Sequence, residues 1–365
     1  MNLLVYFPYN RRAGDVLSFV GEAVDRGHRV FVLTTCERGR FHEMADALGA
    51  TTAAHVVPKA GAIAFHLRHA RHLLAFCRAH GIELVVSHAD ANLAALLARP
   101  FGRFAVLSCR HHVDWAYLNR HRKAMLLDRI VNRLAQHLVV PSRRVRDQVV
   151  SVEGADASKV HLIPYGYRFS LYPAVNEAHA AAIRAQYPAR LRLVTVSRLT
   201  PGKRLPLAFE AIARLAARGC DVRLLVLGEG PDRAALEAWI AARGLSGRVS
   251  LIGFREDLFD FVAASDLSLH LSVEEASNNA VKEIGWLGRP SVVCRGVGDF
   301  DDYLVDGEHG FLVDRDDPLP ALDALLARLC QDGSALPAMG ARARAMILER
   351  FDIARVFDRY APFIR

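Results

Sequence analysis

The chain has 365 residues, of which 52% are hydrophobic and 24% charged, a balance that excludes intrinsic disorder and predicts more than one folded domain. Residues 1–180 hold 23 Lys and Arg against 14 Asp and Glu, a net charge of +9, and the remainder holds 24 against 25, a net charge of −1, which together give +8. The basic first half indicates an anionic partner such as a membrane surface, a phosphate-bearing acceptor or nucleic acid, with solvated surface arginines as the plain alternative.

Short runs of Val, Ile and Leu alternate with longer helical patterns along the chain. The runs that predict buried strands in the first half are Leu3–Phe7, Val30–Thr34, Leu84–Ser87, Phe104–Ser108, His137–Val140 and Val160–Ile163. In the second half they are Leu193–Ser197, Arg223–Leu227, Val249–Ile252, Leu267–Leu271 and Ser291–Cys294, separated by helical patterns such as Pro206–Arg218 and Arg233–Ala242. Such alternation predicts an α/β fold with doubly wound parallel sheets.

This alternation is interrupted between Tyr165 and Pro188, where glycine, proline and a polar, Ala-rich stretch occur. We therefore expect a Rossmann-like domain over residues 1–170, a linker over 171–190 and a second Rossmann-like domain over 191–350. A closing helix, Ile353–Phe363, is expected within a segment 351–365 that packs back on the first domain. Ligands of parallel sheets bind beyond the carboxyl ends of the strands, so a cleft between two such edges is predicted.

The most informative segment, Ser272–Glu283, follows a predicted strand and begins a helix whose N-cap is expected at Ser277 or Asn278. Free N–H groups at a helix start favour a diphosphate. Glu275 and Glu283 would flank that position, and carboxylates suit paired hydroxyls of a ribose or a pyranose. Taken alone, the two glutamates fit an ordinary surface helix much better than a binding site.

Two upstream turns favour the functional interpretation. Arg198 and Lys203 lie in a strand-to-helix turn, where two cations can hold a diphosphate and stabilise the charge that develops as it leaves. Gly228 and Gly230 lie in a second turn after a strand, where glycines allow the backbone to approach a ligand.

Gly288-Arg289-Pro290 and Gly307–Val313 follow these motifs along the chain. In this order, the motifs between roughly residues 194 and 313 resemble the C-terminal domain of GT-B glycosyltransferases, specifically that of the retaining family 4. The resemblance implies that Arg198 and Lys203 bind the donor diphosphate, that Glu275 faces the transferred sugar and that Glu283 holds the ribose. Ser277, Asn278 and Asn279 would surround the phosphates and sugar hydroxyls. Departures from the family are Ala276-Ser277-Asn278 in place of Gly-Phe-Gly, and Asp302 in the position of the usual acidic residue.

The first half resembles the family more faintly, through Arg26–Val30 and Ile163–Gly166. A paired glycine loop after the first strand is missing, which leaves Gly14 as the candidate for close backbone approach. Many relatives place a histidine in the loop after the strand that here ends at Ser108, where it reaches the donor sugar. His112 is our choice for this role, and His111 is the alternative.

The implied function is a retaining transfer of a sugar from a UDP- or GDP-linked donor to a glycan or lipid-linked hydroxyl, in bacterial surface polysaccharide or glycolipid synthesis. In the mechanism proposed for the family, an oxygen of the leaving diphosphate takes the acceptor proton. The protein's task is then positioning and charge stabilisation, so neither a metal nor a further cofactor is expected. The triplets Asp299-Phe300-Asp301 and Asp314-Arg315-Asp316 are attributed to chance.

The competing functions are a nucleotide-sugar epimerase or hydrolase of the same fold and a catalytically silent binding subunit. A nicotinamide dehydrogenase would need a GxGxxG run, which is missing. Aromatic residues are only 8% and do not interleave with basic stretches, which argues against nucleic acid. No signal peptide, long apolar segment or CxxC pair occurs, so the protein is expected to be cytoplasmic. The basic stretch Leu118–Arg146 is predicted to lie peripherally on an anionic inner leaflet.

Overall fold

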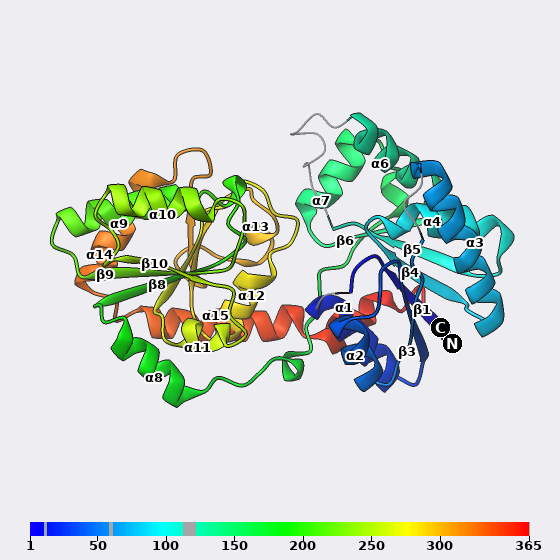
Figure 1. Ribbon diagram of the computed structural model, residues 1–365, viewed down its shortest axis with the longest axis horizontal. Coiled ribbons are helices and arrows are strands. Elements are labelled where there is room, and N and C mark those ends of the chain that lie inside the picture. Colours follow the sequence, from blue (N-terminus) through cyan, green and yellow to red (C-terminus); the bar gives the residue numbers. More distant parts are fainter. Residues whose placement is uncertain (11–12, 58–60, 112–121, 365) are drawn as a thin grey trace. The chain divides into compact units, whose positions relative to one another are not determined.

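The structure, a computed structural model, describes residues 1–10, 13–57, 61–111 and 122–364. It divides into two compact units, each built on one parallel sheet (Figure 1). The first unit comprises Met1–Tyr172 and Arg350–Arg365, and the second comprises Pro173–Glu349. The predicted α/β fold with two parallel sheets is thereby confirmed.

Seven strands of the described chain form the first sheet, in the order β3-β2-β1-β4-β5-β6-β7. Their bounds are β1 (Asn2–Phe7), β2 (Arg29–Thr34), β3 (Thr51–Ala54), β4 (Leu84–His88), β5 (Ala105–Cys109), β6 (His137–Val140) and β7 (Val160–Leu162). All neighbouring strands pair in parallel, and Leu4 of β1 lies opposite Phe31 of β2 and Val85 of β4. The strand order reverses between β1 and β4, which is where a ligand site is expected.

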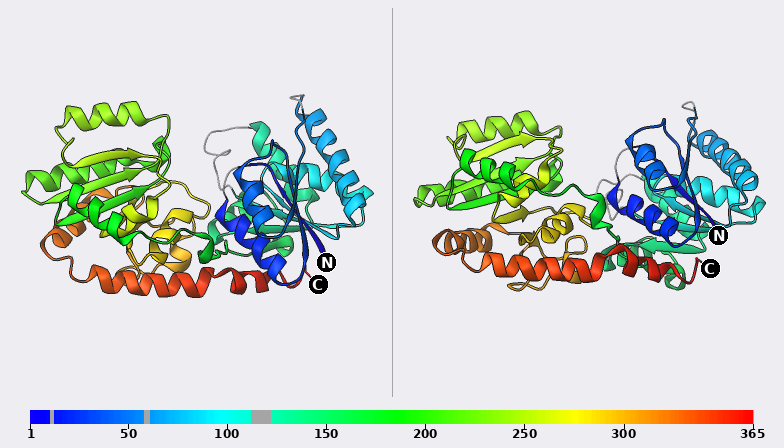
Figure 2. Two further views of the ribbon diagram at one scale, coloured as in Figure 1. Left: turned by 60° about the horizontal axis from the view of Figure 1, so that its bottom comes forward. Right: turned by 90° about the horizontal axis from the view of Figure 1, so that it is seen from below.

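Helices connect these strands. They are α1 (Gly14–Asp25), α2 (Arg40–Ala47), α3 (Ala62–His80), α4 (Ala91–Ala98), α6 (Arg122–Leu134) and α7 (Arg143–Asp147), with shorter helical turns at Arg99–Phe101, Gln148–Val152, Ala157–Lys159 and Phe169–Leu171. The chain ends with α16 (Ile353–Phe357) and the turn Asp358–Tyr360, which pack against α1. Both ends of the chain lie side by side in this unit (Figures 1 and 2).

The second sheet has the strand order β10-β9-β8-β11-β12-β13, again all parallel. Its strands are β8 (Leu191–Val196), β9 (Val222–Leu227), β10 (Val249–Gly253), β11 (Leu267–His270), β12 (Ser291–Cys294) and β13 (Phe311–Val313). Its helices are α8 (Glu177–Gln186), α9 (Leu205–Ala217), α10 (Arg233–Ala242), α11 (Leu258–Ala263), α12 (Asn279–Trp286), α13 (Phe300–Tyr303), α14 (Leu319–Gln331) and α15 (Leu336–Phe351), with a helical turn at Pro201–Lys203. The order reverses between β8 and β11.

Helices cover both faces of each sheet (Figure 2), which explains why the central strands are continuous apolar runs. Leu3, Leu4 and Val5 are consecutive in β1 and all fully buried, as are Leu224, Leu225 and Val226 in β9. Within the described ranges, no helix combines the length and the apolar character that crossing a bilayer requires.

The structure departs from the predicted elements at three places. The strands β3 and β13 were not predicted, because Thr51–Ala54 is polar and half exposed and Phe311–Val313 is only three residues long. The predicted linker 171–190 contains α8, which packs Ala180 and Ile183 into the core of the second unit. The closing helix is shorter than predicted, because α16 ends at Phe357.

Candidate functional site

The turn after β8 carries the two predicted cations. Arg198 is exposed, and Lys203 closes the helical turn Pro201–Lys203. The neighbouring Arg204, which no motif had indicated, anchors this turn. Its guanidinium donates to the carbonyl oxygens of Leu271 at 2.7 Å and Arg315 at 2.6 Å. Arg204 has a left-handed backbone (φ of 49°), so the chain reverses sharply there before α9 begins.

The two predicted glycines pack the turn after β9 against the turn after β8. A Cβ on Gly228 would collide with the carbonyl oxygen of Ser197, and one on Gly230 with that of Leu199. Gly228 also has a φ of +132°, which side chains rarely adopt. The prediction attributed these glycines to the approach of a ligand, whereas the contact that requires them in the structure is between two backbone turns.

Glu275 lies beside Lys203 at the carboxyl ends of β8 and β11. Lys203 Nζ forms an ion pair and hydrogen bond with Glu275 Oε1. Burial opposes ionisation of this carboxyl, but the Lys203 charge and its hydrogen bond, with smaller contributions from neighbouring groups, together outweigh it, and the pKa of Glu275 lies below its ordinary value. Gly298 packs against this segment, since a Cβ there would lie 2.8 Å from Glu275 Cβ. Lys203 and Glu275 therefore neutralise each other in the free protein.

His270 ends β11 next to this ion pair. It is 2% exposed, and its Nε2 is buried with no hydrogen-bond partner in the described chain. Burial lowers its pKa to about 4, with Lys203 acting in the same direction and Glu275 against it. His270 is consequently neutral at physiological pH and adds no charge to the site.

Helix α12 begins at Asn279, and Asn278 is its N-cap, with Oδ1 accepting from the Val281 N–H at 2.9 Å. The N-cap is thus one of the two predicted residues. Glu283 is half-buried in the second turn of this helix. Arg198, Lys203, Glu275, Ser277, Asn278, Asn279 and Glu283 therefore all belong to turns or to one helix at the carboxyl edge of the same sheet.

A buried ion pair, missed by the sequence analysis, supports the start of α12. Lys282 is fully buried, and its Nζ lies 2.6 Å from Asp299 Oδ2 and 2.8 Å from Ser277 Oγ. Ser277 Oγ donates to Asp299 Oδ2 at 2.7 Å. These contacts connect the start of α12 to the segment before α13, and removal of either charge would leave the other uncompensated.

In the first unit, His88 and His111 lie at the carboxyl ends of β4 and β5. His88 Nδ1 lies 2.8 Å from His111 Nε2, and His111 Nδ1 lies 2.6 Å from Tyr165 Oη. Burial lowers the pKa of His88 to about 3, so this imidazole is neutral. A cavity of about 40 Å³ adjoins the three side chains and is also lined by Asp15. His111, the alternative in the prediction, is thus part of a hydrogen-bonded chain, while His112 lies outside the described residues.

The segment before His111 is anchored by Arg110, which is 6% exposed. Its guanidinium contacts both oxygens of Glu153, at 2.9 and 3.0 Å, and also pairs with Asp128. Gly14 begins α1, and a Cβ there would lie 2.6 Å from Tyr172 Oη. A larger residue at position 14 would therefore require the Tyr172 side chain to shift, and the contact of Gly14 with a ligand stays a prediction.

The acidic groups considered as metal ligands have other partners. Asp299 is held by Lys282, Asp301 accepts from the Gly296 N–H at 2.6 Å, and Asp314 accepts from the N–H groups of Asp316 and Asp317. These triplets serve as local backbone caps or ion-pair partners.

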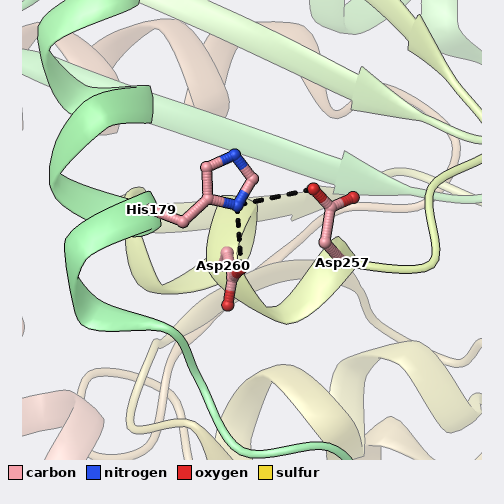
Figure 3. A group of neighbouring side chains, drawn as sticks. All are labelled: His179, Asp257 and Asp260. Atoms are coloured by element: carbon pink, nitrogen blue, oxygen red, sulfur yellow. Dashed lines mark hydrogen bonds and ion pairs between the residues drawn. The ribbon is translucent and has the colours of Figure 1, made fainter.

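A third acidic group, His179, Asp257 and Asp260, has ligand atoms close enough for a metal (Figure 3). There His179 Nδ1 lies 2.9 Å from Asp260 and 3.5 Å from Asp257, and Asp257 forms two bonds of 2.7 Å with Arg255. Because hydrogen bonds and Arg255 engage these donors, the group serves to fasten α8 to α11. The absence of a required metal stays a prediction.

Comparison with known proteins decides the family. A model described as glycosyl transferases group 1 matches residues 190–332, and one described as glycosyltransferase family 4 matches residues 16–170. Both units are thus covered, in the order that the motifs predicted. The chain belongs to the family 4, or group 1, glycosyltransferases.

Among the curated members of this family, the alpha-D-kanosaminyltransferase of Streptomyces kanamyceticus is 27% identical over 239 residues, which are 64% of this chain and 61% of that one. The lipopolysaccharide core biosynthesis glycosyltransferase LpsE of Rhizobium meliloti is 28% identical over 47% of this chain and 49% of its own. The aligned part is thus about half the length of these relatives.

Among solved structures, HepE of Anabaena in complex with UDP and glucose has a TM-score of 0.84 and 20% identity, covering 99% of this chain and 98% of that one. At this identity the similarity shows a shared fold, and the GT-B architecture predicted from the motifs is confirmed.

Proposed function

We propose that this chain transfers a sugar, with retention of configuration, from a UDP- or GDP-linked donor to a hydroxyl group of a glycan or lipid-linked acceptor. The observation that carries the proposal is the gathering of Arg198, Lys203, Glu275 and Glu283 at the carboxyl edge of one parallel sheet. The similarity to a UDP-bound structure supports a nucleotide-sugar donor. The relationship to a lipopolysaccharide core transferase supports a role in bacterial surface polysaccharide or glycolipid synthesis.

In this proposal the donor diphosphate replaces an internal ion pair. Lys203 is neutralised by Glu275 in the free protein, and a diphosphate at the start of α12 would compete for the ammonium group. Glu275 would then turn to the hydroxyls of the sugar, and Glu283 to those of the ribose. Exposed Arg198 would supply the second cation, and the backbone of Ser277, Asn278 and Asn279 would contribute N–H donors.

The chemical step breaks the bond between the anomeric carbon and the diphosphate oxygen, whose electron pair stays with the diphosphate. The acceptor oxygen bonds to the same face of the anomeric carbon, and its proton passes to the departing phosphate oxygen. Arg198 and Lys203 stabilise the growing negative charge, and loss of one such preorganised group typically lowers kcat by about 10²–10³-fold. His112, or the neighbouring His111, would bind a hydroxyl of the transferred sugar. No step requires a divalent metal.

A membrane contact is part of the proposal. On α6, Leu126, Ile130 and Leu134 are spaced four residues apart, and their exposed fractions are 60%, 40% and 45%. The exposed side chains of Arg122, Arg129 and Arg133 accompany this stripe. Apolar residues beside arginines suit the interface of an anionic leaflet, where a lipid-linked acceptor would reside.

Flotation with phosphatidylglycerol and phosphatidylcholine vesicles tests this contact. The wild type should float with phosphatidylglycerol vesicles and not with phosphatidylcholine vesicles. The double variant Leu126→Ser, Ile130→Ser should stay in the dense fraction. Equal flotation of the wild type with both vesicle types would contradict the membrane contact.

The transfer itself is tested with a panel of UDP- and GDP-linked sugars and octyl glycosides as acceptors in the presence of EDTA. With one donor, we expect the nucleoside diphosphate to be released faster when an acceptor is present. If this donor is α-linked, the product should be an α-glycoside, which proton NMR identifies. Lys203→Ala should reduce this rate by about 10²-fold or more. Isomerisation of the donor without an acceptor would favour the epimerase. Cleavage of the donor that does not depend on an acceptor would favour the hydrolase, and no turnover of any donor would favour the silent subunit.

A further inference from the structure

A cavity of about 410 Å³ lies at the amino edge of the second sheet. Its walls come from the residues that precede β8, β11 and β12, from the end of α14 and from the start of α15. Because the strands are parallel, this edge is opposite to the edge that carries the proposed donor site. A volume of this size is within the range of small-molecule sites, roughly 300–1,000 Å³.

Arg289 contributes a poorly neutralised guanidinium to the wall. Its Nη2 donates to the carbonyl oxygen of Ala263 at 2.7 Å, and its Nε is buried without a hydrogen-bond partner in the described chain. Arg184 donates to the same carbonyl oxygen, so two guanidinium groups meet at one neutral acceptor. Burial and then the charge of Arg184 lower the pKa of Arg289, although Asp266 and Glu177 act in the opposite direction.

The remaining charges near the cavity leave room for an anion. Asp266, the carboxylate among the described wall residues, accepts from the Arg192 N–H at 2.7 Å, and the Arg192 guanidinium lies 3.6 Å from it. Arg190 lines the cavity as a second guanidinium and donates to the carbonyl oxygen of Gln331. Two carboxylates that interact with Arg190 are exposed to solvent: Asp221 accepts from its backbone N–H at 2.8 Å, and the charge of Arg190 contributes to the lowered pKa of Asp332.

We propose that this cavity binds a small phosphate-bearing molecule, with Arg190 and Arg289 as the groups that hold the phosphate. Guanidinium groups suit this role because they offer paired donors to phosphate oxygens. The cavity is larger than a bare phosphate requires, and Leu191, Leu329 and Leu336 supply apolar wall for an organic part. The site shares no residue with the proposed donor site, so it is independent of the proposed transfer.

Isothermal titration calorimetry of the full chain with glycerol phosphate and with inorganic phosphate tests the proposal. We expect glycerol phosphate to bind the wild type at least as tightly as inorganic phosphate. Arg289→Met and Arg190→Gln should each weaken binding by roughly 10- to 100-fold, the effect of losing one charge-assisted contact. Arg214→Gln is the matched control, because Arg214 is an exposed arginine of α9 that pairs with Glu210.

A further variant, Lys203→Ala, separates this cavity from the proposed donor site and should retain the binding that Arg289→Met and Arg190→Gln weaken. Loss of phosphate binding in Lys203→Ala, with binding retained in both Arg289→Met and Arg190→Gln, would place the anion at the donor site and overturn the proposal. Failure of both probes to bind the wild type would also overturn it, as would tighter binding of inorganic phosphate than of glycerol phosphate. Arg190 is exposed, so Arg190→Gln should fold even if Arg289→Met does not, and the melting temperatures of both verify this.

Discussion

The carboxyl edges of the two sheets carry chemically different groups. At the second sheet, two ion pairs dominate, Lys203 with Glu275 and Lys282 with Asp299. At the first sheet, two histidines and a tyrosine form a hydrogen-bonded chain beside a small cavity, and His88 is neutral. A charged edge suits a diphosphate, whereas neutral imidazole and phenol groups suit uncharged hydroxyls.

The difference shows how one kind of parallel sheet supports two kinds of chemistry through its loops. At the candidate site of the second unit, Lys203 and Glu275 neutralise each other in the free protein. In the first unit the site depends on burial, which keeps imidazole uncharged. Variants in the second unit should therefore respond to the loss of a charge, and variants at the histidines of the first unit to a change of pH.

Disruption of the buried ion pair should have the largest effect on stability. Asp299→Ala would leave the fully buried Lys282 without its counter-charge and should lower the free energy of unfolding by about 3–5 kcal/mol. Urea unfolding of the wild type and the variant measures this. In the double variant Lys282→Met, Asp299→Asn most of the loss should be recovered, because no unpaired charge stays buried.

The matched control for this prediction is Arg214→Ala, which breaks an exposed pair with Glu210 and should cost less than about 0.5 kcal/mol. A loss below about 1 kcal/mol for Asp299→Ala would contradict the view that buried charges hold the loop before α12.

The packing of the two glycine turns should have the next largest effect. Gly228→Ala requires a side chain at a φ of +132° and brings Cβ against the Ser197 carbonyl oxygen. We expect a loss of about 2–4 kcal/mol in urea unfolding. Gly202→Ala is the control, since a Cβ there meets nothing within 4 Å. Equal stability of the two variants would show that the turns can separate at no cost.

The neutral histidine of the first unit predicts a response to acid. The pKa of His88 is about 3 in the folded protein and about 6.5 when unfolded, so the unfolded state binds the proton first. Its stabilising contribution is complete above pH 6.5 and is lost as the pH falls toward 3. Between pH 7 and pH 5 the free energy of unfolding should fall by roughly 2 kcal/mol through His88.

Urea unfolding at pH 5, 6, 7 and 8 tests this, with His88→Gln as the variant. His88→Gln should lose about 2 kcal/mol less than the wild type between pH 7 and pH 5, with equal changes in both proteins between pH 7 and pH 8. A parallel decline in both proteins below pH 7 would mean that His88 is protonated in the fold at its ordinary pKa.

The sequence predicted the sheets well because central strands such as Leu3–Phe7 are continuous apolar runs, which burial on both faces requires. It also placed Arg198, Lys203, Glu275 and Glu283 on one edge, because each follows a strand in a parallel sheet. The polar edge strand Thr51–Ala54 lacked this signal.

The supporting contacts were beyond the reach of the sequence. Lys282 and Asp299 are separated by β12 along the chain and meet only in the fold. His88 and His111 become neighbours because β4 and β5 pair in register, with His88 opposite Cys109. Arg204 likewise contacts residues as distant as Arg315. Such contacts leave no local pattern, so the sequence indicated the candidate ligand-binding residues and not the residues that hold them in place.

The most direct test of the central claim is calorimetric titration of UDP and GDP into the wild type, Glu283→Ala and Glu237→Ala. Glu237 is an exposed glutamate of α10 that pairs with Arg233, and it serves as the matched control. If the carboxyl edge of the second sheet is the donor site, one nucleotide should bind the wild type and Glu237→Ala with equal affinity. Its affinity for Glu283→Ala should be lower by about tenfold or more. Binding that is unchanged in Glu283→Ala, or no binding of either nucleotide to the wild type, would contradict the account.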